Sequence, residues 1–159
     1  MASSQSDGAE QRLRDLGIEL PTPPQPFGAY VESVQSGRLL FLSGMLPVVD
    51  HKPKYVGRLG QELDTESGRD ALRSASMSAL SAARAHLGTL DKVTRVVRLG
   101  IYLATSDDFF DQPKVADAAS ELFESIFGKD RTSVRMVLGV ASLPLGMPVE
   151  LEVILEVAE

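Results

Sequence analysis

Two stretches near the C-terminus alternate between apolar side chains and a second, mixed set, which is typical of half-buried strands. In residues 134–140 the even positions are Val134, Met136, Leu138 and Val140, and the odd positions are Arg135, Val137 and Gly139. In residues 149–157 the odd positions are Val149, Leu151, Val153, Leu155 and Val157, opposite Glu150, Glu152, Ile154 and Glu156. The pattern therefore predicts two strands with charged residues on one face, separated by a turn rich in proline and glycine.

Shorter apolar runs earlier in the chain predict further strands. Residues 29–35 and 39–43 are a predicted hairpin, because Ser36 and Gly37 between them are typical turn residues. Residues 93–104 are rich in β-branched and aliphatic side chains and predict a long strand. Within the polar loop 48–60, Tyr55-Val56 predicts a brief strand.

Apolar residues at helical spacing predict two long helices and one short one. The first long helix spans 65–87, where Asp64 or Thr65 caps the start and Gly88 ends it. Pro113 opens the second helix in its first turn, and Gly128 stops it. The predicted buried stripes are Leu72, Ala75, Ala79, Ala83 and Leu87 in the first and Val115, Ala119, Leu122 and Ile126 in the second.

The predicted order of elements is β-β-α-β-α-β-β, which favours an α+β fold with two helices packed on one face of a mixed β-sheet. We expect residues 1–17 to form a flexible N-terminal tail and a short helix over 9–17, followed by a single domain over 18–159. Residues 20–26 hold four prolines and predict an extended arm laid over that domain. The uncovered sheet face carries apolar and charged residues together, so oligomerisation is a natural way to bury it.

Composition excludes several kinds of site. The chain has 159 residues, 43% of them hydrophobic and 24% charged, which is ordinary for one globular domain. It has no cysteine, so it has no disulfide, thiol nucleophile or thiolate metal site. Its two histidines, His51 in a loop and His86 near a helix end, form no cluster, so we expect no metal site and expect His86 to cap helix carbonyls.

Charge and hydropathy argue against two classes of partner. The net charge is −6 and no run of Lys or Arg is present, which argues against a nucleic-acid surface. No apolar run approaches the roughly 18 residues that a membrane span needs. The first ten residues have no apolar signal core, so we expect a cytoplasmic protein.

The familiar catalytic motifs are missing from the sequence. There is no glycine-rich phosphate loop or dinucleotide fingerprint, and the glycines of residues 57–60 lack the spacing. Ser43-Gly44 is not a nucleophile elbow, because the Gly-x-Ser-x-Gly pattern is absent. No lysine lies in a clearly apolar segment that favours Schiff-base chemistry.

Arg135 and Glu150 are the candidates for chemistry that remain. A fixed arginine can hold a carboxylate with paired donors, and a nearby glutamate can hold a water molecule or move a proton. The alternative is structural: an arginine on a strand is usually solvated or part of an ion pair, and three acids on one strand face are typical of solvent exposure. The pattern alone leaves both interpretations open.

Several segments, in order and at matching spacing, resemble the RidA/YjgF family, also called the reactive intermediate deaminase or L-PSP family. The resemblance runs from about Gly17 to the C-terminus and is greatest to a longer branch with an Ile-Glu-Leu-Pro arm, here residues 18–21. The segments are Gly28-Ala-Tyr30, Leu40-Phe-Leu-Ser43-Gly44, Asp108-Phe109-Phe110, Arg135 with Gly139-Val-Ala-Ser-Leu-Pro144, and Val149-Glu150-Leu-Glu152.

The resemblance implies the chorismate-mutase-like α+β fold, a homotrimer with clefts between subunits, and hydrolysis of reactive 2-imino or enamine carboxylates to 2-keto acids and ammonia without a cofactor. It implies that Arg135 holds the substrate carboxylate and that Glu150 positions or activates water. Tyr30, Ser43, Gly44 and Val137 are then expected to contact the substrate.

Three residues depart from the family pattern. Met45 stands where the family usually has Gln, Val137 replaces a small or thiol-bearing residue, and Asp117 stands where Asn is frequent. An extra anion at Asp117 would repel an acidic substrate. Met45 and Asp117 favour a second hypothesis, a protein that binds a 2-keto acid or similar metabolite without turnover. A third, endoribonuclease activity, is disfavoured by the acidic charge and the lack of a histidine pair.

Overall fold

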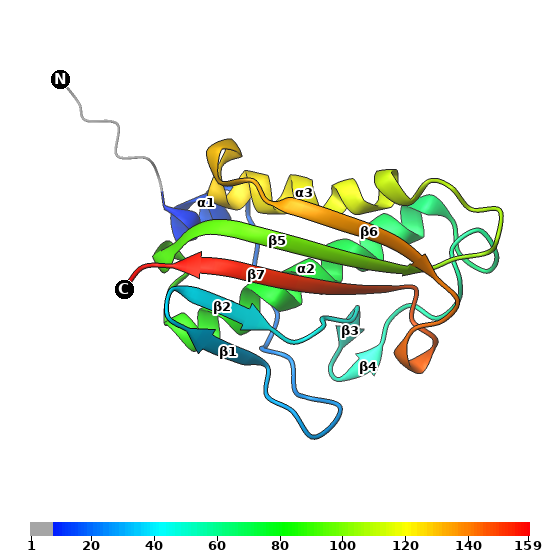
Figure 1. Cartoon of the computed structure of the whole chain (residues 1–159), viewed down its shortest axis with the longest axis horizontal. Helices are drawn as coiled ribbons and strands as arrows, with labels where there is room; N and C mark the ends of the chain where they lie inside the picture. The colour runs from blue at the N-terminus through cyan, green and yellow to red at the C-terminus, as the bar shows by residue number, and fades with distance from the viewer. Residues whose placement is uncertain (1–7) are drawn as a thin grey trace.

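A computed structural model describes residues 8–159 of the chain, which form one mixed sheet with a layer of helices on one face (Figure 1). The strand order in the five-stranded sheet is β1-β2-β7-β5-β6, with β5 and β6 parallel and the other neighbours antiparallel. The strands are β1 (Ser33–Ser36), β2 (Leu39–Leu42), β5 (Val93–Ala104), β6 (Val134–Val140) and β7 (Val149–Val157). The remaining pair, β3 (Val48–Val49) and β4 (Lys52–Pro53), forms a separate hairpin.

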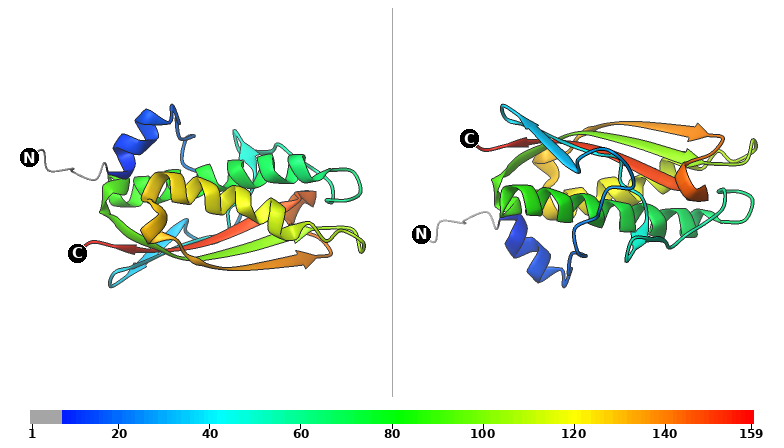
Figure 2. Two further views of the ribbon diagram at one scale, coloured as in Figure 1. Left: turned by 90° about the horizontal axis from the view of Figure 1, so that it is seen from above. Right: turned by 90° about the horizontal axis from the view of Figure 1, so that it is seen from below.

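The helices are α1 (Ala9–Asp15), α2 (Thr65–Leu87) and α3 (Gln112–Phe127), and α2 and α3 cover one face of the sheet (Figure 2). Asp64 begins α2, because its side chain accepts a hydrogen bond from the Ser67 N–H at 2.8 Å. Gly88 ends it with a φ of 84°, a left-handed conformation that favours glycine. Three short 3₁₀ turns complete the chain: Leu90–Lys92, Lys129–Arg131 and Pro144–Gly146.

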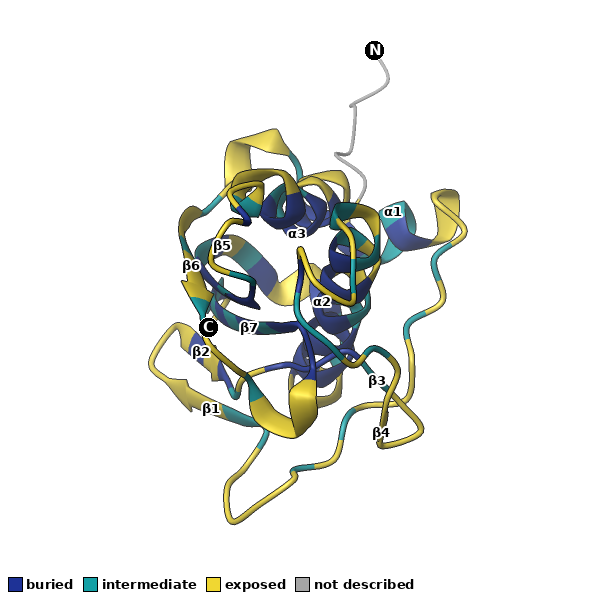
Figure 3. Ribbon diagram, turned by 90° about the vertical axis from the view of Figure 1, so that its right-hand side faces the viewer, coloured by how far each residue is buried: buried dark blue, intermediate teal, exposed yellow. Residues whose placement is uncertain are grey.

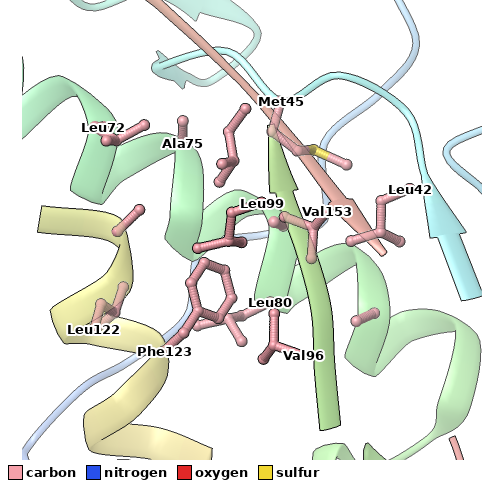
Figure 4. Close-up of a cluster of buried hydrophobic side chains, with 14 of the residues drawn as sticks. Leu42, Met45, Leu72, Ala75, Leu80, Val96, Leu99, Leu122, Phe123 and Val153 are labelled. Carbon is pink, nitrogen blue, oxygen red and sulfur yellow. The ribbon is translucent and has the colours of Figure 1, made fainter. Parts of the chain in front are cut away.

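The core lies between this helix layer and the sheet (Figure 4). Strand β7 alternates along its length, and the five residues predicted to be apolar and buried are all buried. Both predicted helix stripes are buried as well. Small alanine and serine residues on α2 let it lie close to the sheet, and Leu80 and Phe123 fill the space beside Leu99 and Val153 (Figure 4).

In β6 the apolar positions of the alternating pattern are exposed, whereas in β7 they are buried. In β6 the side chains of Val134, Met136 and Leu138 are exposed by 69%, 50% and 45%. Arg135 is paired with Leu99 of β5, which is buried, so the odd positions of β6 face the helix layer. Exposed residues cover much of β6 and β1, whereas β7 and the inner faces of the helices are buried (Figure 3). The sheet face away from the helices is therefore left open, and it is apolar along β6 and carries the Arg98–Glu152 ion pair beside it.

The short helix α1 packs on the helix layer. Leu13 is only 1% exposed, and Glu10 accepts two hydrogen bonds from Arg84 of α2, at 2.7 and 3.0 Å. Beyond α1 the proline-rich arm crosses α2, where the Ser81 hydroxyl donates to the Pro21 carbonyl. Residues 1–7 of the expected flexible tail lie outside the described residues.

Three local expectations were wrong. Strand β1 begins at Ser33 and not at residue 29, because residues 28–30 form a tight turn in which the Tyr30 N–H donates to the Gly28 carbonyl. Tyr55-Val56 forms no strand; the pairing in that loop belongs to β3 and β4, joined by a turn at Asp50 and His51 with φ of 51° and 62°.

The third concerns His86, which we expected to cap carbonyls of its own helix. Its ring nitrogens instead contact the Ser33 hydroxyl at 3.2 Å and the Gln35 side-chain oxygen at 2.9 Å. The reason is that β1 lies beside the last turn of α2.

No helix within residues 8–159 is long and apolar enough to cross a bilayer.

Candidate functional site

Glu150, at the start of β7, lines a small cavity of about 330 Å³ beside the end of β2. Three stretches of the chain that are distant in sequence, residues 27–30, 43–46 and 144–150, contribute to this cavity. Its lining residues are Phe27, Tyr30, Ser43, Gly44, Leu46, Pro144 and Glu150. The cavity combines one carboxyl group with two aromatic rings, which suits a small molecule with an apolar part.

The Glu150 carboxyl lies directly against Gly44. A Cβ atom at residue 44 would clash with Glu150 Oε1, so a side chain there would displace the carboxyl group. Burial raises the pKa of Glu150 above its ordinary value of 4.5, because the desolvated carboxylate is disfavoured. A carboxyl group of this kind can exchange protons closer to neutral pH than an exposed one.

Hydrogen bonds fix the aromatic wall of the cavity. The Tyr30 hydroxyl accepts a hydrogen bond from the Phe27 N–H at 2.9 Å. The Ser43 hydroxyl donates to the Val31 carbonyl at 2.6 Å, so its proton is already used in holding this segment. Ser43 can therefore accept a hydrogen bond from a ligand but is not placed as a nucleophile.

Arg135 lies on β6 and points toward α3. Its Nη1 donates to Asp117 Oδ1 at 2.8 Å and to the Ser120 hydroxyl at 3.1 Å. Its Nε and Nη2 atoms have no hydrogen-bond partner among residues 8–159. The edge of the guanidinium formed by Nε and Nη2 is the one that binds a carboxylate with two parallel bonds.

Arg135 and Glu150 project from opposite faces of the sheet. Arg135 is paired with Leu99 of β5, whereas Glu150 is paired with Tyr102 of the same strand. Leu99 and Tyr102 are three residues apart, so their side chains point to opposite faces. A single chain therefore brings Tyr30, Ser43 and Gly44 to Glu150, and leaves Arg135 and Val137 on the helix side of an edge strand.

Sequence reasoning missed several residues of this arrangement. Phe27, Leu46 and Pro144 line the cavity, and no spacing rule points to them because they lie in turns and loops. Asp117, one of the departures from the family pattern, is half exposed and pairs with Arg135, a contact that the sequence did not indicate. Met45, the noted departure from the family, is buried and bridges to Leu151, so its side chain belongs to the core and not to the cavity.

The residues described by the structure include no group of three or more His, Cys, Asp or Glu side chains that could hold a metal ion. The donor set at the candidate site is one carboxyl group, hydroxyls and aromatic rings. What the site offers from its own residues is a carboxyl group for proton transfer and, on the other sheet face, an arginine edge for an anion.

Comparison with known proteins gives one family. A family model described as "YjgF/chorismate_mutase-like, putative endoribonuclease" matches residues 10–156. Protein TCP17 of Trypanosoma cruzi is 39% identical over 145 residues, covering 91% of each chain. A protein of Dermatophagoides farinae named 2-iminobutanoate/2-iminopropanoate deaminase is 30% identical over 135 residues, covering 85% of this chain and 91% of its own.

Solved structures agree with the fold. The Agrobacterium tumefaciens protein Atu1372, of unknown function, superposes with a TM-score of 0.86 at 33% identity and covers 94% of this chain and 92% of its own. A Shewanella oneidensis MR-1 protein gives a TM-score of 0.90 at 28% identity, covering 95% of this chain and 100% of its own. With the family model matching nearly the whole chain and these folds superposing on it, the protein belongs to the RidA/YjgF family and has its chorismate-mutase-like fold.

Proposed function

We propose that this protein is a cofactor-free hydrolase that converts reactive 2-imino carboxylates, or their enamine tautomers, to 2-keto acids and ammonia. Membership of the family supports this, together with a relative at 30% identity that is named 2-iminobutanoate/2-iminopropanoate deaminase. The observation that carries the proposal is the Glu150 carboxyl, which is held against Gly44 in an aromatic-lined cavity with a raised pKa.

The proposed chemistry needs a single proton-transferring group. Water adds to the imine carbon while the Glu150 carboxylate accepts a proton from it, and Glu150 then gives this proton to the imine nitrogen, which yields a neutral carbinolamine and restores the carboxylate. The hydroxyl proton then passes by way of Glu150 to that nitrogen, the C–N bond breaks, and ammonia leaves as the 2-keto acid forms. Glu150 ends each turnover as a carboxylate, and a raised pKa suits a group that both accepts and returns a proton.

Arg135 is the proposed holder of the substrate carboxylate. Asp117 and Ser120 bind Nη1 and so fix the plane of the guanidinium, while Nε and Nη2 are the donors available to a ligand. Two parallel charge-assisted hydrogen bonds give both affinity and a defined orientation. Orientation matters because water must approach one face of the imine carbon.

A homotrimer is part of the same proposal, because one chain does not bring Arg135 to Glu150. The edge strand β6 of one subunit, with Arg135 and Val137, would border the Glu150 cavity of the next. The open sheet face supports this assembly, since Val134, Met136 and Leu138 on it are exposed by 69%, 50% and 45%. Exposed apolar residues gathered on one face are typical of an interface.

A second candidate function is favoured by one observation. Asp117 places a carboxylate 2.8 Å from Arg135, which weakens the attraction of the guanidinium for another anion. A site with a weakened clamp can bind a 2-keto acid reversibly without supporting efficient turnover. The alternative is therefore a protein that binds 2-keto acids on the same fold.

Ammonia release from a 2-imino acid, generated in the assay by an amino-acid oxidase, tests the proposal. We expect acceleration by the wild type and a loss of roughly a hundredfold or more in Arg135→Ala. Arg135→Lys keeps the charge without the planar edge and should recover only part of the rate. Arg14→Ala, a remote exposed change on α1, is the matched control. If the wild type gives no acceleration but binds 2-oxobutanoate in calorimetry, the binding function replaces the hydrolase.

A further inference from the structure

A second cavity, with a volume of about 720 Å³, adjoins the Glu150 cavity, and His51 in its wall stacks on Phe27 of the Glu150 cavity with the ring centroids 4.0 Å apart. Its walls are the proline-rich arm over residues 19–25, the β3–β4 hairpin with Tyr55 beyond it, and the face of α2 between Asp70 and Ser78. The right-hand view of Figure 2 shows the arm crossing α2 on its way to the sheet. Volumes between about 300 and 1,000 Å³ are those of small-molecule sites.

The walls of this cavity are held in place by hydrogen bonds. The Ser81 hydroxyl of α2 donates to the Pro21 carbonyl and ties the arm to the helix. The Lys54 N–H donates to the Pro47 carbonyl at 3.1 Å, and this closes the base of the hairpin. The prolines of the arm have a fixed φ and no N–H to satisfy, so the arm can line a cavity without unpaired backbone donors.

The lining combines apolar surface with charges of both signs. Met77 of α2, Tyr55 and the prolines of the arm supply the apolar surface. Arg73 and Asp70 lie on the α2 wall, and Lys54 lies on the hairpin wall. Neither Arg73 nor Lys54 forms an ion pair within residues 8–159. Unpaired cations and anions around an apolar space are complementary to a ligand that carries both charges on an apolar body.

We propose that this cavity is a second small-molecule site that binds an apolar α-amino acid as its zwitterion. Arg73 and Lys54 take the carboxylate, Asp70 takes the ammonium group, and the side chain lies between Met77 and Tyr55. The carboxylates of Asp50 and Glu19, which also line the cavity, disfavour ligands with net negative charge. The proposal concerns binding alone and does not depend on the proposed hydrolase activity.

Isothermal calorimetry on the full chain tests the ligand class. L-phenylalanine is the zwitterionic probe, 3-phenylpropanoate lacks its ammonium group, and 2-phenylethylamine lacks its carboxylate. We expect L-phenylalanine to bind at least about tenfold more tightly than either analogue, since a charge-assisted hydrogen bond is lost in each. Equal binding of all three, or no heat with L-phenylalanine at millimolar concentration, would overturn the proposal.

Variants decide which site the probe occupies. Arg73→Ala should weaken L-phenylalanine binding at least about tenfold, whereas Arg14→Ala on α1 should leave it unchanged. Arg73 is exposed, so its removal should not disturb folding, and circular dichroism checks this. Arg135→Ala should bind the probe as the wild type does. If Arg135→Ala loses binding and Arg73→Ala keeps it, the probe occupies the Glu150 site and the proposal fails.

Discussion

At the scale of single residues, the proposed chemistry needs Glu150 and needs Gly44, which lets the Glu150 carboxyl approach the turn after β2. Any side chain at Gly44 would displace the carboxyl group, since even a Cβ would clash with Oε1. Burial at this position disfavours the charged form and raises its pKa. Burial of the Glu150 carboxylate therefore lowers the stability of the folded protein at neutral pH, and the same burial keeps a carboxyl group available for proton transfer.

Glu150→Gln should stabilise the protein more at pH 7 than at pH 4. The folded-state pKa of Glu150 is above the unfolded value, so folding binds protons between the two values. The stability gained from neutral Glu150 is complete below about 4.5 and is lost as pH rises through the folded pKa. Denaturant unfolding of both proteins across this range measures the difference. A stability difference that does not change with pH would contradict the assigned burial of Glu150.

Asp117→Asn should lower the KM for a 2-imino carboxylate roughly three- to tenfold, with kcat nearly unchanged. The amide oxygen can still accept a hydrogen bond from Arg135, but it no longer repels the substrate carboxylate. Asp117→Ala also removes the repulsion but no longer orients Arg135, so its kcat should fall. Steady-state kinetics of both variants separate the two effects. A higher KM in Asp117→Asn would show that the carboxylate assists substrate binding.

At the scale of elements, substitutions in and beside α1 test whether this helix, Ala9–Asp15, is docked on the domain in solution. Leu13→Ala should lower the free energy of unfolding by about 2–4 kcal/mol, because Leu13 is 1% exposed and packs on the helix layer. Leu16→Ala on the same segment is the matched control, since Leu16 is 50% exposed and its removal should cost less than about 0.5 kcal/mol. Equal effects in urea unfolding would mean that α1 is not docked in solution.

Most elements could be predicted from the sequence, because their signals are local. Helical spacing and the stop at Gly88 predicted the bounds of α2, Thr65–Leu87, and strict alternation predicted β7. Alternation could not tell which face of β6 is covered. Its apolar face is open and Arg135 faces α3, because the position of a strand in the sheet decides which face the helices cover. The prediction of a strand at Tyr55-Val56 was wrong because the turn at Asp50 and His51 forms a tighter hairpin earlier in the chain.

The candidate site could be predicted only in part. Tyr30, Ser43, Gly44 and Glu150 line one cavity, and their contact with a substrate stays a prediction. The resemblance could not show that Arg135 pairs with a β5 residue three positions from the partner of Glu150. Nor could it show that the side chains of Arg135 and Glu150 project from opposite faces of the sheet. Nor could it show the Asp117 contact, which depends on the register of α3 over β6. Long-range register is a tertiary property that no local pattern encodes.

At the scale of the whole molecule, the open sheet face predicts self-association. We expect light scattering at micromolar concentration to give the mass of a trimer, and unfolding to depend on protein concentration. Met136→Asp introduces a charge in the exposed apolar face and should dissociate the assembly with little effect on the isolated fold. Leu16→Asp, at a residue after α1 that is as exposed as Met136, is a control for added charge away from the sheet. A monomeric wild type would contradict the proposed assembly.

Arg135 of one subunit is proposed to act with Glu150 of its neighbour, and assemblies that contain two different variants test this. Arg135→Ala and Glu150→Gln are each expected to lose ammonia release from a 2-imino acid. Unfolding and refolding an equal mixture of the two should restore about a quarter of the wild-type activity, since random mixing in a cyclic trimer gives that share of intact sites. A mixture as inactive as its components, in an assembly shown to contain both chains, would contradict the proposal.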